Sequence, residues 1–136
     1  MSAKSVLFVC VSNAGKSVMA AGLMRHLAGG DVHVASAGTH AKTAVNDVAV
    51  QTLAEVGVDI SDHRPTQLTD QMIADADRVV IVGTQADLKH HPDTLIQRWE
   101  TDEPSLRGIE GIDRMRIIRD DIAARVNALA AELTTR

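Results

Sequence analysis

The chain has 136 residues, of which 45% are hydrophobic and 24% charged, and its formal net charge at pH 7 is −4. This length fits a single domain over residues 1–136, because two cores would be hard to build from so short a chain. The negative charge argues against nucleic acid as a partner, since the chain lacks a surplus of cations to release counterions. No apolar run approaches the length of a bilayer span, so we expect no membrane partner.

Cys10 is the one cysteine of the sequence, and Phe8 and Trp99 are its only aromatic residues. A single cysteine rules out an internal disulfide and makes the reducing cytoplasm the expected location. Two rings offer little for stacking on a base or an aryl substrate. The six histidines lack the i, i+4 spacing of a zinc-binding helix, so we expect no metal ligands.

Apolar spacing predicts strands that alternate with helices along the chain. The strands are expected at residues 5–10, 32–38, 78–83 and, on a weaker pattern, 95–99. The helices are expected at residues 17–28, 45–56, 68–76 and 112–133, the last with one long apolar face. This order is typical of a layered α/β fold with right-handed crossovers between the strands.

The segment after the first expected strand, Cys-Val-Ser-Asn-Ala-Gly-Lys-Ser at residues 10–17, carries the clearest chemical signal. Ligands of α/β sheets bind beyond the carboxyl ends of the strands, and Cys10 stands at such an end. A polar turn that leads into a helix can present backbone N–H groups to an anion, and Lys16 adds charge that favours a thiolate. We therefore predict a nucleophilic Cys10 in an oxyanion-binding loop. The alternative is a buried structural cysteine, the commoner role of a lone cysteine.

The end of this segment, Ala-Gly-Lys-Ser at residues 14–17, is also similar to the P-loop pattern G-x-x-x-x-G-K-[ST]. The first glycine of that pattern would fall on Cys10, so the match fails where the tight turn is needed. The strand at residues 78–83 also ends in glycine rather than in an acidic residue suited to Mg²⁺. A nucleotide hydrolase is the weaker interpretation.

The sequence resembles the low-molecular-weight protein tyrosine phosphatase superfamily along essentially its whole length. The loop of that superfamily reads C-x-x-N-x-x-R-S after the first strand; Cys10, Asn13 and Ser17 fit it, and Lys16 replaces the arginine. The further similarities are residues 36–39, His63-Arg64, the strand at residues 78–82, Glu103-Pro104 and the long last helix. The resemblance implies a three-layer α/β fold with a four-stranded parallel sheet of order 2-1-3-4, and thiolate chemistry on a tetrahedral oxyanion.

Arsenate reductases form one part of this superfamily, and one branch of them uses two further cysteines after the third strand. Residues 82–89 contain no cysteine, so an arsenate reductase with this sequence would need an external thiol. The sequence is similar to arsenate–mycothiol transferases in Cys-Val-x-Asn-x-Gly-Lys-Ser, in Trp99 with Glu103-Pro104, and in residues 114–120. This resemblance implies arsenate or phosphate as the oxyanion, mycothiol as co-substrate, mycoredoxin as partner and no bound cofactor.

The resemblance also implies roles for the loop residues. The Cys10 thiolate would attack arsenic, and Ser17 would donate its hydroxyl to the sulfur, although serine is equally a common helix N-cap. Asn13 would brace the loop through hydrogen bonds to the backbone. The oxyanion would be held by the backbone N–H groups of the loop and by the lysine ammonium: Val11, Ser12, Asn13, Ala14, Gly15 and Lys16.

Glu103 is favoured over Asp102 as the general acid, although the superfamily normally carries aspartate directly before the proline. Arg64 is interpreted as a surface residue in preference to a ligand of the oxyanion or thiol. Because an ammonium is a point charge and a guanidinium grips two oxygens, Lys16 predicts poor phosphatase activity. Two other functions stay open: a phosphatase acting on phosphotyrosine or a small phosphoester, and a non-catalytic oxyanion-binding sensor.

Overall fold

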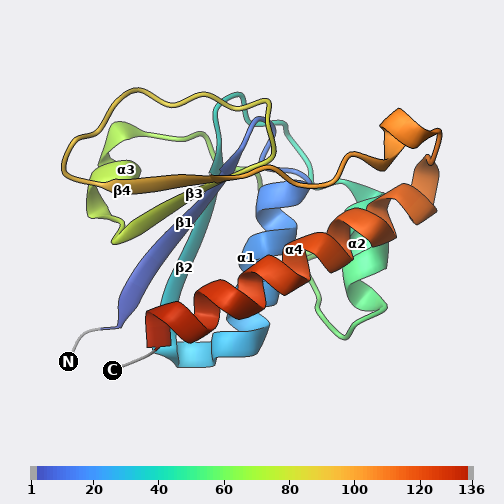
Figure 1. Cartoon of the computed structure of the whole chain (residues 1–136), viewed down its shortest axis with the longest axis horizontal. Coiled ribbons are helices and arrows are strands. Elements are labelled where there is room, and N and C mark those ends of the chain that lie inside the picture. The colour runs from blue at the N-terminus through green and yellow to red at the C-terminus, as the bar shows by residue number, and fades with distance from the viewer. Residues whose placement is uncertain (1–2, 135–136) are drawn as a thin grey trace.

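The computed structural model describes residues 3–134, which form a parallel sheet with helices on both faces (Figure 1). The four strands are β1 (Lys4–Cys10), β2 (Val32–Gly38), β3 (Arg78–Val82) and β4 (Leu95–Trp99). Their order is β2-β1-β3-β4, and all three neighbouring pairs are parallel. The fold class and the strand order implied by the family resemblance are therefore confirmed.

Two unequal layers of helix cover the sheet, as Figure 1 shows. The helices are α1 (Lys16–Ala28), α2 (Asp47–Ala54), α3 (Asp70–Asp75) and α4 (Gly111–Thr134). Val6 and Phe8 of β1 belong to the larger core beneath α1, α2 and α4, whereas Leu7 and Val9 pack with Ile73 of α3. This alternation follows from the strand's period of two, and burial on both faces explains the continuous apolar run of β1.

Capping residues make the two short helices shorter than apolar spacing predicts. Asn46 Oδ1 accepts a hydrogen bond from the N–H of Ala49 at 3.0 Å, so α2 begins at Asp47 and not at residue 45. The hydroxyl of Thr69 accepts from the N–H of Met72 at 3.2 Å and starts α3 in the same way. Two 3₁₀ turns, η1 (Gly29–Asp31) and η2 (Pro104–Arg107), were not predicted.

The long helix α4 crosses in front of α1 and α2 in the view of Figure 1, contacts both, and closes the larger core. Its buried residues recur at spacings of three and four, as predicted: Met115, Ile118, Ile122, Val126, Leu129 and Ala130. Its other face carries charged residues, and no helix within residues 3–134 is long and apolar enough to cross a membrane.

Glu55, directly after α2, ties this helix to α4. Its carboxylate accepts hydrogen bonds from Arg116 Nη2 at 2.6 Å and from Arg119 Nη1 at 2.7 Å. The hydrogen bond from Arg116 is the main reason that the pKa of Glu55 is lowered to about 2; desolvation opposes it, and Arg119 adds to it. The pair of arginines thus fixes the position of α2, whose preceding segment contacts the loop described next.

Candidate active site

The loop between β1 and α1 forms the floor of a cavity of about 620 Å³. Cys10 is the last residue of β1 and is 7% exposed. The cavity is lined by this loop, by residues 42–46, by the segment after β3, by Glu103 and by the first turns of α4. The carboxyl end of the central strand therefore carries the thiol, where a ligand site of an α/β sheet is expected.

Backbone hydrogen bonds from the segment after β2 set the direction of the loop's peptide groups. The carbonyl oxygens of Cys10, Val11, Ser12 and Ala14 accept from the N–H groups of residues 39, 40, 42 and 46, at 2.8–3.0 Å. Because the peptide unit is planar and trans, each N–H that follows such a carbonyl points the opposite way. The N–H groups of residues 11, 12, 13 and 15 therefore point away from that segment, and the N–H of Asn13 meets the Cys10 sulfur at 3.3 Å, an arrangement suited to a nest for an anion.

Two hydrogen-bond donors contact the sulfur of Cys10. The N–H of Asn13 lies 3.3 Å from Sγ, and Ser17 Oγ lies 2.9 Å from it. Asn13 Nδ2 in turn donates to Ser17 Oγ at 2.9 Å. Because this bond occupies a lone pair of the hydroxyl, the proton of Ser17 is free to point at the sulfur. Both side chains are fully buried, so water does not compete with these donors for the sulfur.

Asn13 adopts φ = 51°, a left-handed conformation that asparagine tolerates better than most residues. Its Oδ1 accepts from the N–H of Thr66 at 2.9 Å, which fixes the orientation of the amide and directs Nδ2 at Ser17. His63 Nε2 lies 3.0 Å from the carbonyl oxygen of Asn13 and 3.1 Å from its Oδ1. Since both atoms are acceptors, Nε2 carries the proton. Asn13 thus braces the loop through its side chain as well as its backbone.

Burial lowers the pKa of His63; the hydrogen bond to Asn13 opposes this, and the charge of Arg25 reinforces it. The ring is therefore neutral at pH 7, and it holds the loop through the single N–H at Nε2, which donates to Asn13. Sequence reasoning missed this role, because the histidine is 50 positions from Asn13. The His63-Arg64 pair within the resemblance was the one available signal.

Gly38, at the end of β2, lies directly against the loop. A Cβ at this position would stand 2.6 Å from the carbonyl oxygen of Val11 and 2.9 Å from the amide nitrogen of Asn13. Both are backbone atoms, which cannot rotate away as a side chain can. Glycine is therefore required here so that β2 and the loop can approach each other.

Lys16 begins α1 and reaches across the cavity to Glu103, with which it forms an ion pair. The stem of the lysine passes over Gly83, where a Cβ would stand 3.2 Å from Nζ. Glu103 also faces Arg114 of α4, whose Nη2 lies 3.5 Å from Oε2. A cation is disfavoured at a helix N-terminus, so the carboxylate offsets this cost and holds the lysine over the loop.

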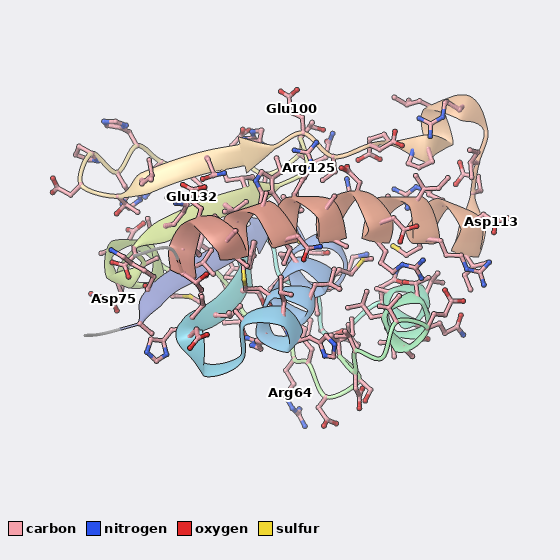
Figure 2. All side chains as sticks on the ribbon, turned by 60° about the horizontal axis from the view of Figure 1, so that its bottom comes forward. Arg64, Asp75, Glu100, Asp113, Arg125 and Glu132 are labelled. Atoms are coloured by element: carbon pink, nitrogen blue, oxygen red, sulfur yellow. The ribbon has the colours of Figure 1, made fainter. Side chains whose placement is uncertain are left out.

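The structure separates the two candidate acids. Glu103 lines the cavity, whereas Asp102 is paired with Arg107 through two hydrogen bonds of 2.7 and 3.0 Å. The hydrogen bond from Arg107 lowers the pKa of Asp102, partly against desolvation. Asp102 is not among the residues that line this cavity, and neither is Arg64, which is exposed and points away from the chain in Figure 2.

Within residues 3–134, no group of three histidine, cysteine, aspartate or glutamate side chains is arranged to hold a metal ion. The polar groups that do converge are a thiol with two donors, a nest of N–H groups, an ammonium and a carboxylate. Together they suit a nucleophilic displacement at a tetrahedral anion, with Cys10 as nucleophile and Glu103 beside the leaving oxygen. Arg114, which the sequence placed only within a similar stretch, joins them.

The chain matches the model of the low molecular weight phosphotyrosine protein phosphatase family over residues 5–136. It is 32% identical over 131 residues to arsenate reductase 1 of Staphylococcus haemolyticus, and the alignment covers 93% of this chain and 94% of that protein. An arsenate reductase of Halalkalibacterium halodurans is 32% identical over 138 residues, and that alignment covers 96% of this chain and 97% of the relative.

Solved structures agree with these relatives. A thioredoxin-dependent arsenate reductase of Corynebacterium glutamicum superposes with a TM-score of 0.80 at 34% identity. The superposition covers 96% of this chain and 62% of the longer Corynebacterium chain. An arsenate reductase in the phosphate-binding state has a TM-score of 0.81 at 27% identity, covering 96% and 98% of the two chains. On the fold, the cysteine loop and these similarities, the protein belongs to the low molecular weight phosphotyrosine protein phosphatase family.

Proposed function

We propose that this protein is an arsenate reductase in which Cys10 passes the arsenic group to an external thiol, and that the thiol is mycothiol. One observation carries the proposal: the only cysteine of the chain lies at the floor of the oxyanion cavity, so no second thiol of the chain can resolve an adduct on it. The names of the relatives support the arsenate half of the proposal. The resemblance to arsenate–mycothiol transferases supports the mycothiol half.

In the first step, the N–H nest and Lys16 bind arsenate, and the Cys10 thiolate attacks arsenic. A sulfur–arsenic bond forms and an arsenic–oxygen bond breaks. Glu103, which accepts a proton from water once Lys16 has moved to the substrate, gives that proton to the leaving oxygen, which departs as water. Binding of the oxyanion transfers Lys16 from the carboxylate to the substrate. Each preorganised donor contributes about 3 kcal/mol to the stabilisation of such a transition state.

In the second step, the thiolate of mycothiol attacks arsenic and the bond to Cys10 breaks, with its electron pair returning to the Cys10 sulfur. Arsenic stays pentavalent through both transfers, so neither step needs a reductant. The reduction follows when a mycoredoxin thiolate attacks the mycothiol sulfur. Arsenite then leaves with the bonding electron pair, and a mixed disulfide forms between the two thiols.

A phosphatase is the weaker candidate for two reasons. Lys16 stands where a bidentate guanidinium would grip two oxygens of a phosphoryl group. Among the described residues that line the cavity, none is aromatic, so nothing stacks on a phosphotyrosine ring. We expect slow turnover of phosphate esters.

The test is to incubate the protein with arsenate and follow arsenite in three mixtures: mycothiol with mycoredoxin, glutathione with glutaredoxin, and thioredoxin with its reductase. We expect arsenite in the first mixture alone, and none from Cys10→Ser in any of them. Arsenite formed with thioredoxin and no small thiol would contradict the mycothiol half. No arsenite in any mixture, together with rapid hydrolysis of phosphotyrosine, would contradict the whole proposal.

A further inference from the structure

The cavity over Cys10 is larger than an oxyanion requires. Its volume is about 620 Å³, whereas arsenate has five heavy atoms and a water molecule occupies about 30 Å³ of the liquid. The part beyond the loop is lined by residues 42–46, by residues 84–86 and by α4. A second molecule therefore fits in the same cavity beside the oxyanion.

We propose that this outer part of the cavity binds the thiol co-substrate. It is formed by Lys42, Ala44 and Asn46, by residues 84–86, and by Arg114, Met115 and Ile118 of α4. We further propose that it selects a thiol of low molecular weight whose body is uncharged and rich in hydroxyl groups. Both statements rest on the proposed function, and they go beyond it by assigning a site and a basis for selection.

Access to the sulfur supports this location. The protein side of Cys10 Sγ is occupied by Ser17 Oγ at 2.9 Å and by the N–H of Asn13 at 3.3 Å, both from fully buried residues. An arsenic atom bonded to this sulfur therefore lies on the cavity side. A thiol that attacks in line has to approach through the outer part of the cavity.

The charges that line the cavity favour an uncharged thiol. The cations are Lys16, Lys42 and Arg114, and the one carboxylate is Glu103. Lys16 and Arg114 both face that carboxylate, and a dianionic oxyanion supplies the remaining negative charge. With the oxyanion bound, the three cations, the carboxylate and the dianion give the cavity a net charge of about zero. Lys42 is exposed to water, where an added ion pair contributes little to binding. A thiol with carboxylates of its own would meet the bound oxyanion with only the water-exposed Lys42 to pair with.

Apart from Lys42 and Arg114, the polar side chains of the outer part are uncharged. Thr84 and Gln85 offer hydroxyl and amide groups that both donate and accept hydrogen bonds, and Asn46, whose Oδ1 caps α2, offers its amide N–H groups. Gln85 Nε2 donates to Thr84 Oγ1 at 3.1 Å, and both residues are exposed. Such groups match the hydroxyls of a sugar or cyclitol.

The apolar part of the lining comes from α4. Met115 and Ile118 line the cavity and are 8% and 1% exposed. Ligand sites commonly combine an apolar wall with a few polar groups that fix orientation. A hydroxylated ring, which carries C–H groups on its faces and hydroxyls at its edge, fits a lining of this kind.

The first test changes the size of the outer cavity. Ala44→Trp adds bulk at an exposed position of the lining, and we expect the KM for mycothiol to rise about tenfold, as for a lost contact of about 1.4 kcal/mol. Turnover with 2-mercaptoethanol, which needs no outer site, should change less than about twofold. Phosphate should still protect Cys10 from alkylation by iodoacetamide, because the loop is untouched.

The second test changes its polarity. We expect Gln85→Ala to raise the KM for mycothiol. We expect Gln85→Lys to shift the preference toward glutathione, lowering the ratio of kcat/KM for mycothiol over glutathione about twofold to fivefold, as one added exposed charge contact does. The matched control is Gln71→Ala, an exposed glutamine of α3 on the opposite face of the sheet. In this control, the KM for mycothiol and the ratio of kcat/KM for mycothiol over glutathione should equal those of the wild type.

The outcomes separate the site from the function. A wild-type protein that forms arsenite with mycothiol, while Ala44→Trp and Gln85→Ala leave its KM unchanged, overturns this site and leaves the proposed function standing. Equal use of glutathione and mycothiol by the wild type overturns the charge argument. A wild type that forms no arsenite with any thiol overturns the proposed function and the thiol site with it.

Discussion

Replacing Ser17 with alanine removes a single buried hydroxyl that bonds the Cys10 sulfur at 2.9 Å and accepts from Asn13 Nδ2 at 2.9 Å. A hydrogen bond to a charged group contributes about 1.5–3 kcal/mol, so its loss should slow reactions of the thiolate roughly 10- to 100-fold. The variant also leaves Asn13 Nδ2 buried without this partner. The cost of an unsatisfied donor is about 1–3 kcal/mol of unfolding free energy.

The rate of alkylation by iodoacetamide, followed from acid to alkaline pH, measures the first effect, and urea unfolding measures the second. Thr52→Val is the matched control, because Thr52 is equally buried and donates to the carbonyl oxygen of Ala49 at 3.2 Å, away from the cavity. We expect the control to lose stability and keep the reactivity of the thiol. If Ser17→Ala is alkylated as fast as the wild type at every pH, the hydroxyl does not support the thiolate and the reasoning is wrong.

Two further changes probe the frame around the site. In Gly38→Ala, the new Cβ would stand 2.6 Å from the carbonyl oxygen of Val11. We expect at least tenfold more phosphate to be needed to protect Cys10 from alkylation by iodoacetamide. An unchanged phosphate requirement would refute the close approach of β2 to the loop. In Glu55→Gln, the ion pairs with Arg116 and Arg119 are lost. Because the folded pKa of Glu55 is about 2, their contribution is present above the unfolded pKa and disappears as the pH falls through about 2. Thermal unfolding should therefore show destabilisation at pH 7 and little difference near pH 2, and a difference that does not depend on pH would contradict the assignment.

The elements of the fold follow closely from the sequence, because buried strands and an amphipathic helix leave local patterns. Residues 78–82 are apolar throughout since both faces of β3 are covered, and the apolar face of α4 repeats at helical spacing. The limits of α2 were less predictable. Apolar residues continue on both sides of it, and the competing signal, the cap at Asn46, depends on one side-chain hydrogen bond.

Local sequence patterns predicted the site only where its residues are adjacent in sequence, whereas Glu103 was favoured over Asp102 through the family resemblance. Cys10, Asn13 and Ser17 share one loop, and a local pattern was enough to place them together. The ion pair of Lys16 with Glu103 joins residues 87 positions apart, and no spacing rule could have chosen Glu103 over Asp102. That choice depends on which carboxylate Arg107 engages, which is a property of the folded chain.

Trp99 gives this protein an intrinsic fluorescence signal. It is the only tryptophan of the sequence, it is 6% exposed, and its ring lies 5.6 Å from that of Phe8. Its carbonyl oxygen accepts from the N–H of Gly83, the residue over which the stem of Lys16 passes. Its fluorescence therefore arises from one known place, between the core and the wall of the cavity. Emission from this single indole follows unfolding and changes at the lysine side of the site without any attached dye.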